Sequence, residues 1–455
     1  MRQKTKLLLS ILITIVLLLA ACGEERRISG SLSTEPSVAP ADTKMDIRRF
    51  AGTELNFIAN KHPWIDLISP QLEQFSQLTG ITVNLKVYPE EQFRTKRTVE
   101  LMSGLSNIDV FMIMPGNNLD EYYRNKWIEE LNTYMNNPAI RWPEYDLEDM
   151  FNTALKVGIR DGNNYTLPIM LETSLLAYNR DIFETYKIKA PRTMEELEAA
   201  AKTIFEGSGG QIYGITMRGK KSAATSQWID FVRSFGGDWL DKNGRAALHS
   251  PEAIAATQLY GRLLRDYGPP SAPTNSWYES TAMFMQGRSA MIYDASVFKS
   301  NYEDPQMSKV VDKVGYTTIP AGPAGSTPHV SSWGLAISTV SKHKQAAWYF
   351  MQWATSRKFA LEGLLKGIPA ARNSAWNSPI FKASETSPEW TRASLESYRR
   401  ASTRWNPPVV DVNEGREIAG AAIVAAILGN EIYPAAQQAS HRLNRLIEKE
   451  NTDAE

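Results

Sequence analysis

A segment near the start of the chain alternates between two hydrophobic patterns, and this alternation allows few folds. Residues 55–59 and 81–87 have the composition and alternation of strands, and residues 108–114 form the nearly unbroken apolar run of a central strand. Helical periodicity fills the two intervals, through Ile68, Leu72, Phe75 and Leu78 in the first and over residues 93–102 in the second. Strands that alternate with helices form parallel sheets with right-handed crossovers. The sequence therefore predicts an α/β fold.

The N-terminus has the layout of an export signal. Three basic residues precede a continuous apolar run over residues 7–21, which ends in small residues. The run is shorter than the roughly 20 residues that a membrane-spanning helix needs. Its end, Leu-Ala-Ala-Cys at residues 19–22, resembles the bacterial lipobox, in which the cysteine is lipidated and becomes the first residue of the mature protein. We therefore expect residues 1–22 to be a lipoprotein signal peptide ending at the lipidated Cys22, with an ordinary cleaved signal as the alternative.

The segment after this signal is unsuited to folding. Residues 23–44 are polar, rich in Ser and Pro, and free of aromatic residues, so they cannot bury enough apolar surface to form a core. We expect a flexible tether that holds the folded body at the cell membrane, on its extracytoplasmic face. Cys22 is the only cysteine, which excludes a disulfide within the chain.

The remaining composition is that of an ordinary globular protein. About 430 residues follow the signal, enough for two or three domains. Lys and Arg total 50, as do Asp and Glu, so no overall field favours nucleic acid. The 12 Trp and 18 Tyr residues supply flat apolar faces beside hydrogen-bonding tips. We expect a monomer that binds no nucleic acid.

Later segments extend the α/β pattern. Residues 174–178 and 290–293 are predicted strands, and Thr193 with Glu196 forms a capping box that opens a helix. Residues 418–428 are apolar but too short to cross a bilayer, which predicts a buried helix near the C-terminus.

Several stretches together resemble the extracellular solute-binding proteins of carbohydrate ABC importers. They include YTLPIMLETSLLAYNRDIF at 165–183, IYGITMRGK at 212–220, FMQGRSAMIYD at 284–294 and SSWGLAI at 331–337. Their order and spacing fit nearly the whole mature chain. The parts around Arg218 and Asp294 most resemble members of this family that take polyols or α-glucosides.

The resemblance implies two α/β lobes joined by crossing segments, with the ligand in the cleft between them and closure by a hinge. On this basis we expect lobe one to comprise residues 45–168 and 318–369. Lobe two is expected to comprise residues 172–314 and 373–455, including the C-terminal helices. The implied function is to capture a sugar or polyol and deliver it to the permease of an ABC importer, without catalysis.

A sugar or polyol is neutral and dense in hydroxyls, and it carries apolar C–H patches. Its site needs charged or amide side chains for the hydroxyls and aromatic faces for the patches, in loops that follow strands. The candidate ligand-binding residues are Trp64, Asn117, Glu172, Arg218, Trp228, Trp277, Asp294, Trp333 and Arg372. Trp333 is the strongest stacking candidate, and Asp294 ends an apolar strand, where a carboxylate is costly unless it is paired or contacts a ligand.

Several candidates also have a structural alternative. Trp64 and Trp228 suit core packing, and Asn117 suits a turn that bonds its own backbone. Arg218 and Arg372 suit ion pairs or clamps between the lobes.

Other chemistries find little support in the sequence. Residues 214–220 have the spacing of a phosphate-binding loop, but Lys221 stands where Ser or Thr would bind magnesium. The five His residues are dispersed, without metal-ligand spacing, and no Gly-x-Ser-x-Gly motif is present. We expect neither a metal nor a cofactor.

Two alternatives to a carbohydrate-binding protein remain. A surface glycan hydrolase would use two carboxylates about 5–10 Å apart, for which Glu172 and Asp294 are the candidates. The same binding fold could instead be tuned to a peptide, a polyamine or another charged solute.

Overall fold

The computed structural model describes residues 46–104, 107–143 and 145–452. The chain divides into two units, Met1–Lys44 and Met45–Glu455, and the structure discussed below is that of the second. The predicted signal peptide, Cys22 and the tether lie outside the described residues. Within these ranges, no helix combines the length and the hydropathy that crossing a bilayer requires.

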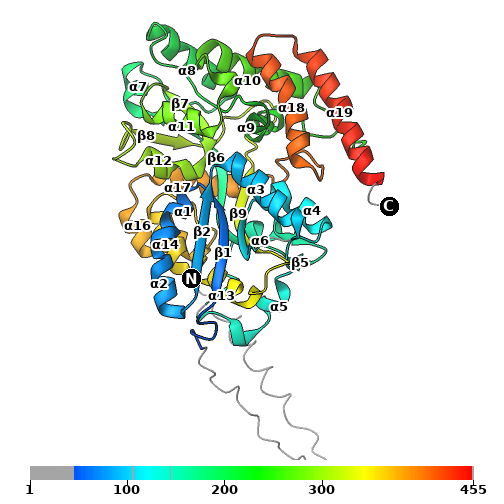
Figure 1. Ribbon diagram of the computed structural model, residues 1–455. Helices are drawn as coiled ribbons and strands as arrows, with labels where there is room; N and C mark the ends of the chain where they lie inside the picture. Colours follow the sequence, from blue (N-terminus) through cyan, green and yellow to red (C-terminus); the bar gives the residue numbers. More distant parts are fainter. Residues whose placement is uncertain (1–45, 105–106, 144, 453–455) are drawn as a thin grey trace, which may run out of the picture. The chain divides into compact units, whose positions relative to one another are not determined.

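The first lobe is built on a sheet whose parallel part confirms the sequence prediction. Strands β1 (Glu54–Asn60), β2 (Thr82–Tyr88) and β3 (Val110–Ile113) are parallel, with β1 between the other two. Strand β9 (Val330–Ile337), which returns from much later in the chain, lies antiparallel to β3. These strands lie in the lower half of Figure 1.

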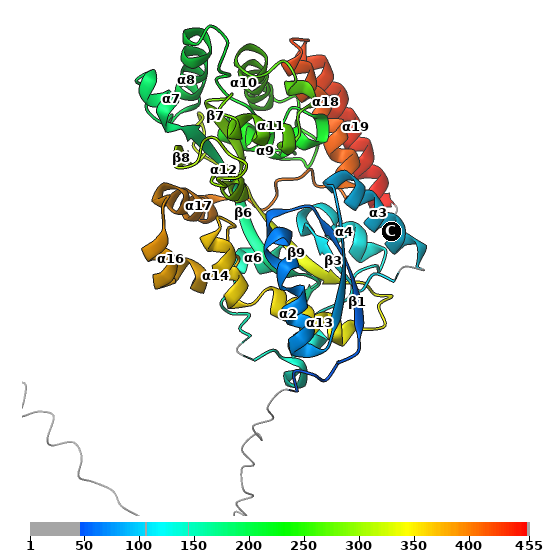
Figure 2. The ribbon, with the colours of Figure 1, turned by 60° about the vertical axis from the view of Figure 1, so that its left-hand side comes forward.

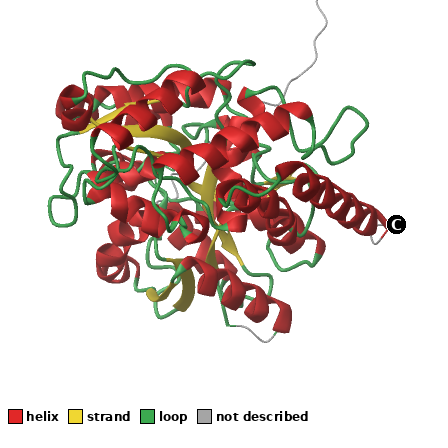
Figure 3. Cartoon of the chain, turned by 90° about the horizontal axis from the view of Figure 1, so that it is seen from above, coloured by secondary structure: helices red, strands yellow, loops and turns green. Residues whose placement is uncertain are grey.

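Strand β6 (Leu167–Asn179) belongs to both lobes. Its first half, Leu167 to Thr173, pairs with β9. Its second half pairs with β7 (Met291–Ala295) from Ser174 onward and with β8 (Val314–Thr317) from Leu176 onward. The result is a sheet with the order β2-β1-β3-β9-β6-β7, in which β6 also pairs with β8. The sheet is flanked by helices, as the view from above shows (Figure 3).

The helices divide between the two parts of this sheet. Lobe one carries α1 (Pro63–Ile68), α2 (Leu72–Thr79), α3 (Glu90–Ser103), α4 (Pro115–Arg124), α5 (Asn132–Met135), α6 (Asn152–Lys156), α13 (Lys344–Ala354) and α14 (Arg357–Leu365), with the small hairpin β4 (Ile159–Arg160) and β5 (Asn163–Asn164). Lobe two carries α7 (Arg180–Thr185), α8 (Met194–Gly207), α9 (Lys221–Ser234), α10 (Pro251–Tyr267), α11 (Trp277–Met285), α12 (Lys299–Tyr302), α18 (Val412–Ile427) and α19 (Ile432–Thr452). Between them lie α15 (Asn373–Asn377), α16 (Pro379–Ser384) and α17 (Pro388–Arg400).

The chain crosses between lobes later than the expected boundaries at 318 and 373. Residues 321–327 still bond to lobe two, because Ala324 N donates to Ser234 O and Met194 N donates to Ala321 O. Helices α15 and α16 pack on α14. Helix α17 then packs on β8 and β6, and the loop over residues 401–411 leads from it into α18; we call this loop the last crossing.

Local sequence explains several element boundaries. The hydroxyl of Thr193 accepts from Glu196 N at the start of α8, while the Glu196 carboxylate accepts from Arg192 N, which stabilises the predicted start of the helix. The apolar segment near the C-terminus is the buried helix α18, as predicted. Gly420 in this helix packs on the backbone of Lys221, where a Cβ would lie 2.4 Å from a carbonyl carbon. This contact brings α18 against the start of α9 (Figure 2).

Candidate functional site

A partly open cavity of about 50 Å³ lies between the lobes, beside the midpoint of β6. Its walls come from both lobes and from the 401–411 crossing. The lining includes Asn60, His62, Glu90, Met114, Glu172, Thr173, Ser174, Arg218, Gln227, Trp277, Phe298, His329, Ser331, Trp333 and Trp405. A groove of about 990 Å³ between α8, β8 and α17 is larger, but it is open, and no comparable set of buried polar side chains converges on it. The cavity beside β6 is therefore the candidate site.

An arginine–aspartate pair forms the charged centre of the site. Arg218 Nη2 lies 2.5 Å from Asp294 Oδ1, and Arg218 Nε lies 3.1 Å from Asp294 Oδ2. Asp294 also accepts from Gln227 Nε2 at 3.1 Å and from Ala295 N at 2.7 Å. Its side chain is fully buried behind the guanidinium. Asp294 therefore positions Arg218, and Arg218 presents hydrogen-bond donors to the cavity.

Glu172 contributes a carboxyl group with one unused oxygen. It lies on β6, and its Oε1 accepts from Ser331 Oγ at 3.2 Å. Its Oε2 is buried and has no hydrogen-bonding partner among the described residues. Burial raises the pKa of Glu172 to about 7, although Arg218 opposes this shift. The free oxygen can accept a hydrogen bond from a ligand hydroxyl, or donate one when the group is protonated.

Glu90 closes the cavity from lobe one. Its Oε2 accepts from the indole of Trp277 in lobe two at 2.9 Å, and its Oε1 pairs with Arg94. Burial alone would raise the pKa of Glu90, but Arg94 and Arg218, together with the Trp277 hydrogen bond, lower it to about 2. Glu90 is therefore ionised, and its bond with Trp277 joins the two lobes at the mouth of the cavity.

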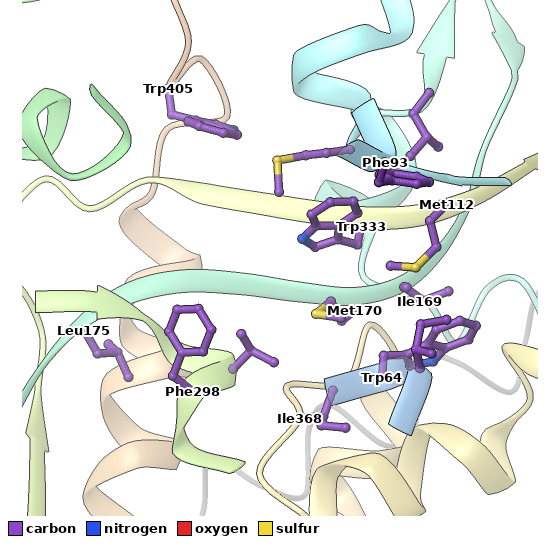
Figure 4. Close-up of a cluster of buried hydrophobic side chains, with 14 of the residues drawn as sticks. Trp64, Phe93, Met112, Ile169, Met170, Leu175, Phe298, Trp333, Ile368 and Trp405 are labelled. Carbon is purple, nitrogen blue, oxygen red and sulfur yellow. The ribbon is translucent and has the colours of Figure 1, made fainter. Parts of the chain in front are cut away.

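Aromatic faces complete the lining. The Trp277 ring stacks on Phe298 with centroids 4.9 Å apart, and Trp405 stacks on His329 at 5.3 Å. Trp333 on β9 lies 5.6 Å from His62. In the view of Figure 4, Trp333 and Trp405 lie on the same side of the β6 ribbon. Such faces suit the C–H patches of a hydroxylated ligand.

Two histidines in the lining are held by neighbours. His62 Nδ1 accepts from Trp64 N at 3.2 Å, and burial lowers the pKa of His62 to about 4. A neutral ring that accepts at Nδ1 carries its proton on Nε2, which is therefore a donor. His329 Nδ1 lies 2.8 Å from Asp230 Oδ2, which also accepts from Tyr293 Oη at 2.6 Å.

The structure brings four of the nine predicted site residues to the cavity wall. Glu172, Arg218, Trp277 and Trp333 line it, and Asp294 lies directly behind Arg218.

The other four candidates lie elsewhere. Trp64 packs in the lobe-one core, beside Ile368 in Figure 4. Trp228 donates to Thr257 Oγ1 at 2.8 Å and packs on Trp239. Asn117 accepts from Asn406 in the 401–411 crossing. Arg372 donates to Thr355 O and Asp146 O and pairs with Asp149 in the wall of lobe one.

Sequence reasoning missed several lining residues. His62 lies near the candidate Trp64 after β1, and Ser331 lies near the candidate Trp333 at the start of β9, so the signals that selected those two candidates could also have found them. Glu90 begins α3, directly after β2, and follows the same rule. Trp405 had no such signal, because its loop does not follow a strand and reaches the cavity only through the last crossing.

Comparison with known proteins agrees with this geometry. The sequence profile of the family described as bacterial extracellular solute-binding protein matches residues 64–360. A relative, the erythritol/L-threitol-binding protein of Mycolicibacterium smegmatis, is 29% identical over 369 residues, which covers 77% of this chain and 76% of the relative.

Solved structures show the same fold. A solute-binding protein of an ABC transporter from Agrobacterium radiobacter K84, in complex with ribitol, superposes with a TM-score of 0.79 at 28% identity and covers 87% of this chain and 99% of its own. One from Agrobacterium vitis S4 with bound D-mannitol gives a TM-score of 0.78 at 24% identity, with coverage of 87% and 99%. Two lobes around a shared cavity and a family match over most of the chain confirm the sequence resemblance: the chain belongs to the bacterial extracellular solute-binding proteins.

Proposed function

We propose that this protein captures a small polyol or sugar in the cavity between the lobes and delivers it to the permease of an ABC importer. The observation that supports this is the make-up of the lining, in which Arg218, Glu90 and Glu172 lie beside the faces of Trp333 and Trp405. A neutral ligand with many hydroxyls and apolar C–H patches satisfies both kinds of surface. The polyols named for the relatives above support the same class.

The size of the cavity favours a short ligand. A water molecule needs about 10–15 Å³ of such space, so 50 Å³ holds about four waters. This cavity alone is too small for an oligosaccharide. We therefore propose that four- to six-carbon polyols bind more tightly than disaccharides.

A thermal-shift screen of the full-length protein in detergent tests this function. Polyols of increasing length, monosaccharides and disaccharides form the panel. A ligand at 100 times its dissociation constant should stabilise the fold by about 2.7 kcal/mol. Trp333→Ala should fold and lose most of this stabilisation, whereas the surface control Arg399→Met should retain it. If no polyol or sugar raises the melting temperature of the wild-type protein, the proposed function is wrong.

We also propose that the protein is not an enzyme. A glycan hydrolase would need Glu172 and Asp294 as a pair across the bond. Both oxygens of Asp294 bond to Arg218, and one also bonds to Gln227, so this carboxylate is not free to act on a ligand. Chromatography of an oligosaccharide after long incubation should reveal no cleavage products.

The cellular part of the proposal rests on the sequence. We propose that Cys22 is lipidated and anchors a monomer on the extracytoplasmic face of the cell membrane. Cys22→Ser should abolish incorporation of labelled palmitate, and light scattering of the detergent-solubilised wild-type protein should give a monomer mass. A variant that still incorporates palmitate would refute the anchor.

A further inference from the structure

A second chamber of about 320 Å³ adjoins the cavity. The two share lining residues Glu90, Met114, Arg218, Trp277 and Trp405. We call the first the inner cavity and the second, whose further lining includes Arg94, Lys220, Ser222, Ala223, Glu279 and Arg416, the outer chamber. A ligand group that leaves the inner cavity past Arg218 and Trp277 enters the outer chamber.

Arg416 in α18 is the unusual residue of the outer chamber. It is only 4% exposed, yet it forms no ion pair with any residue that the structure describes. Its Nε donates to Ser222 O and to Thr225 Oγ1, both at 2.8 Å, and its guanidinium lies 5.3 Å from the Trp405 ring centre. Its two terminal amino groups have no hydrogen-bonding partner within the described part of the chain.

Three other buried arginines have more of their guanidinium nitrogens hydrogen-bonded than Arg416 has. Arg233 pairs with Asp238, and Arg372 pairs with Asp149. Arg97 has no carboxylate partner, but all three of its nitrogens donate, to Tyr122, Met112 O and Asn118. Arg416 alone among these four leaves two nitrogens unused. Buried charges are normally paired, so a buried guanidinium that lines a chamber without a carboxylate partner is a candidate to bind an anionic group.

The start of α9 adds partial positive charge at the same place. This helix has 14 residues, and its N-cap residue, Lys220, provides no side-chain cap. Its first backbone N–H groups lack intrahelical partners, and both Ser222 and Ala223 line the chamber. An uncapped helix N-terminus favours an anion. The packing of Gly420 on Lys221 sets this arrangement, because Arg416 lies one turn before Gly420 on the same face of α18.

The carboxylates of the outer chamber are already engaged. Glu90 accepts from Arg94 and Trp277, and Glu91 pairs with Lys220. Glu279 caps its own helix by accepting from Ser276 N at 2.8 Å. Burial, together with the positive charges of Arg94 and Arg218, lowers the pKa of Arg416 to about 9, while Glu90 and Glu417 oppose this shift.

We propose that the outer chamber binds a carboxylate or phosphate group carried by a ligand whose hydroxylated part occupies the inner cavity. This inference rests on the proposed function. It narrows the ligand class to acids derived from polyols or sugars and to phosphate esters of polyols or sugars. The anion accepts hydrogen bonds from the free amino groups of Arg416 and from the first N–H groups of α9.

Matched ligand pairs test the proposal. Isothermal titration of the full-length protein in detergent compares ribitol with ribonate and ribitol 5-phosphate, and threitol with threonate. Hydrogen bonds to charged groups predict that at least one acid or ester binds about ten- to a hundred-fold more tightly than its neutral partner. Arg416→Met should remove this preference and leave the affinity for the neutral polyol within about twofold, Arg416→Lys should keep most of it, and Arg399→Met should change nothing.

A second measurement needs no variant at the site. Raising the salt concentration from about 20 mM to about 500 mM should weaken binding of the anionic ligand several-fold and leave neutral polyol binding unchanged. Equal affinity for neutral and anionic partners, or a preference that survives Arg416→Met, overturns this inference alone. Failure of every neutral and anionic ligand to bind overturns the proposed function, and this inference with it.

Discussion

Arg218 and Arg372 are both nearly enclosed, and both pair with an aspartate, yet their surroundings differ in one respect. Arg218 and Asp294 form one wall of a cavity, so part of the guanidinium faces unfilled space. Arg372 and Asp149 lie within lobe one, where the arginine also donates to two backbone carbonyls and stacks over Tyr145. The Arg218–Asp294 pair can contact a ligand in the cavity, whereas the Arg372–Asp149 pair stabilises the interior of lobe one. The difference is in what the pair faces, not in the pair itself.

Removing the cavity arginine should have the largest effect. Arg218→Met leaves the Asp294 carboxylate buried without its cation, which should lower the free energy of unfolding by about 3–5 kcal/mol. It also removes the donors that face the cavity, so polyol affinity should fall at least about a hundred-fold. Urea denaturation and titration calorimetry measure the two effects. Unchanged affinity would show that the Arg218–Asp294 pair, like the Arg372–Asp149 pair, stabilises the fold and does not bind the ligand.

Replacing Arg372 should lower stability without weakening ligand binding. Arg372→Met should also cost about 3–5 kcal/mol of unfolding free energy, because Asp149 loses a buried partner. Below its melting temperature, however, the variant should bind polyol within about twofold of the wild-type affinity. A large loss of affinity in the folded variant would contradict the conclusion that Arg372 stabilises lobe one and does not contact the ligand.

Glu172 should make stability depend on pH. Its pKa is about 7 in the folded protein, above the ordinary value of 4.5, so the folded state binds the proton more tightly than the unfolded state. The resulting stabilisation is fully present below pH 4.5 and is lost as the pH rises through 7. This shift corresponds to about 3 kcal/mol. The neighbouring charges are Arg218, Asp294 and Glu90.

Urea denaturation at a series of pH values checks this dependence. Glu172→Gln should flatten the decline in stability between about pH 5 and pH 8. Arg399→Met, on the exposed side of α17, serves as the control and should keep the wild-type slope. An unchanged slope in Glu172→Gln would show that Glu172 is already ionised near its ordinary pKa.

Trp405→Ala should weaken polyol binding about tenfold, because it removes an aromatic face from the cavity. Trp64→Ala, the same substitution in the lobe-one core, should lower stability but leave the affinity of the folded protein unchanged. Titration calorimetry with a neutral polyol compares the two. Equal effects would mean that Trp405 acts through packing on His329 rather than through the ligand.

The smallest effect is expected for a pair that faces solvent. Lys220 pairs with Glu91 across the lobes, with side chains 44% and 78% exposed. Because exposed ion pairs contribute little, Lys220→Met should change neutral polyol affinity by less than about twofold. A larger change would show that this contact helps to hold the lobes closed.

These comparisons also explain how far the sequence alone could lead. The parallel strands β1 to β3, the start of α8 at Thr193 and the buried helix α18 followed from local patterns, because periodicity and capping are short-range. Of the 13-residue strand β6, only residues 174–178 were predicted as a strand, since Pro168 interrupts the pattern of its first half. In the sheet, a register shift between Pro168 and Met170 accommodates the proline.

The site was predictable where position after a strand carried the information. This rule found Glu172 and Arg218, and it also selected Trp64, which does not line the cavity. Trp333 was selected at the entry to a strand, and Arg372, which does not line the cavity, was selected beside an expected crossing between the lobes. Local sequence does not reveal whether a charged side chain faces a cavity or the interior of a lobe. Trp405 and Arg416 reach their places through the last crossing and through the packing of α18 on α9, which are contacts between distant parts of the chain.

The position of Glu172, Thr173 and Ser174 in the middle of β6 has a mechanical consequence. These residues line the cavity at the point where the strand exchanges one set of partners for another. A bound molecule therefore contacts the strand that both lobes share. Any rotation of the lobes about this strand would be amplified at their outer ends, where a transporter could detect it without reaching the bound molecule.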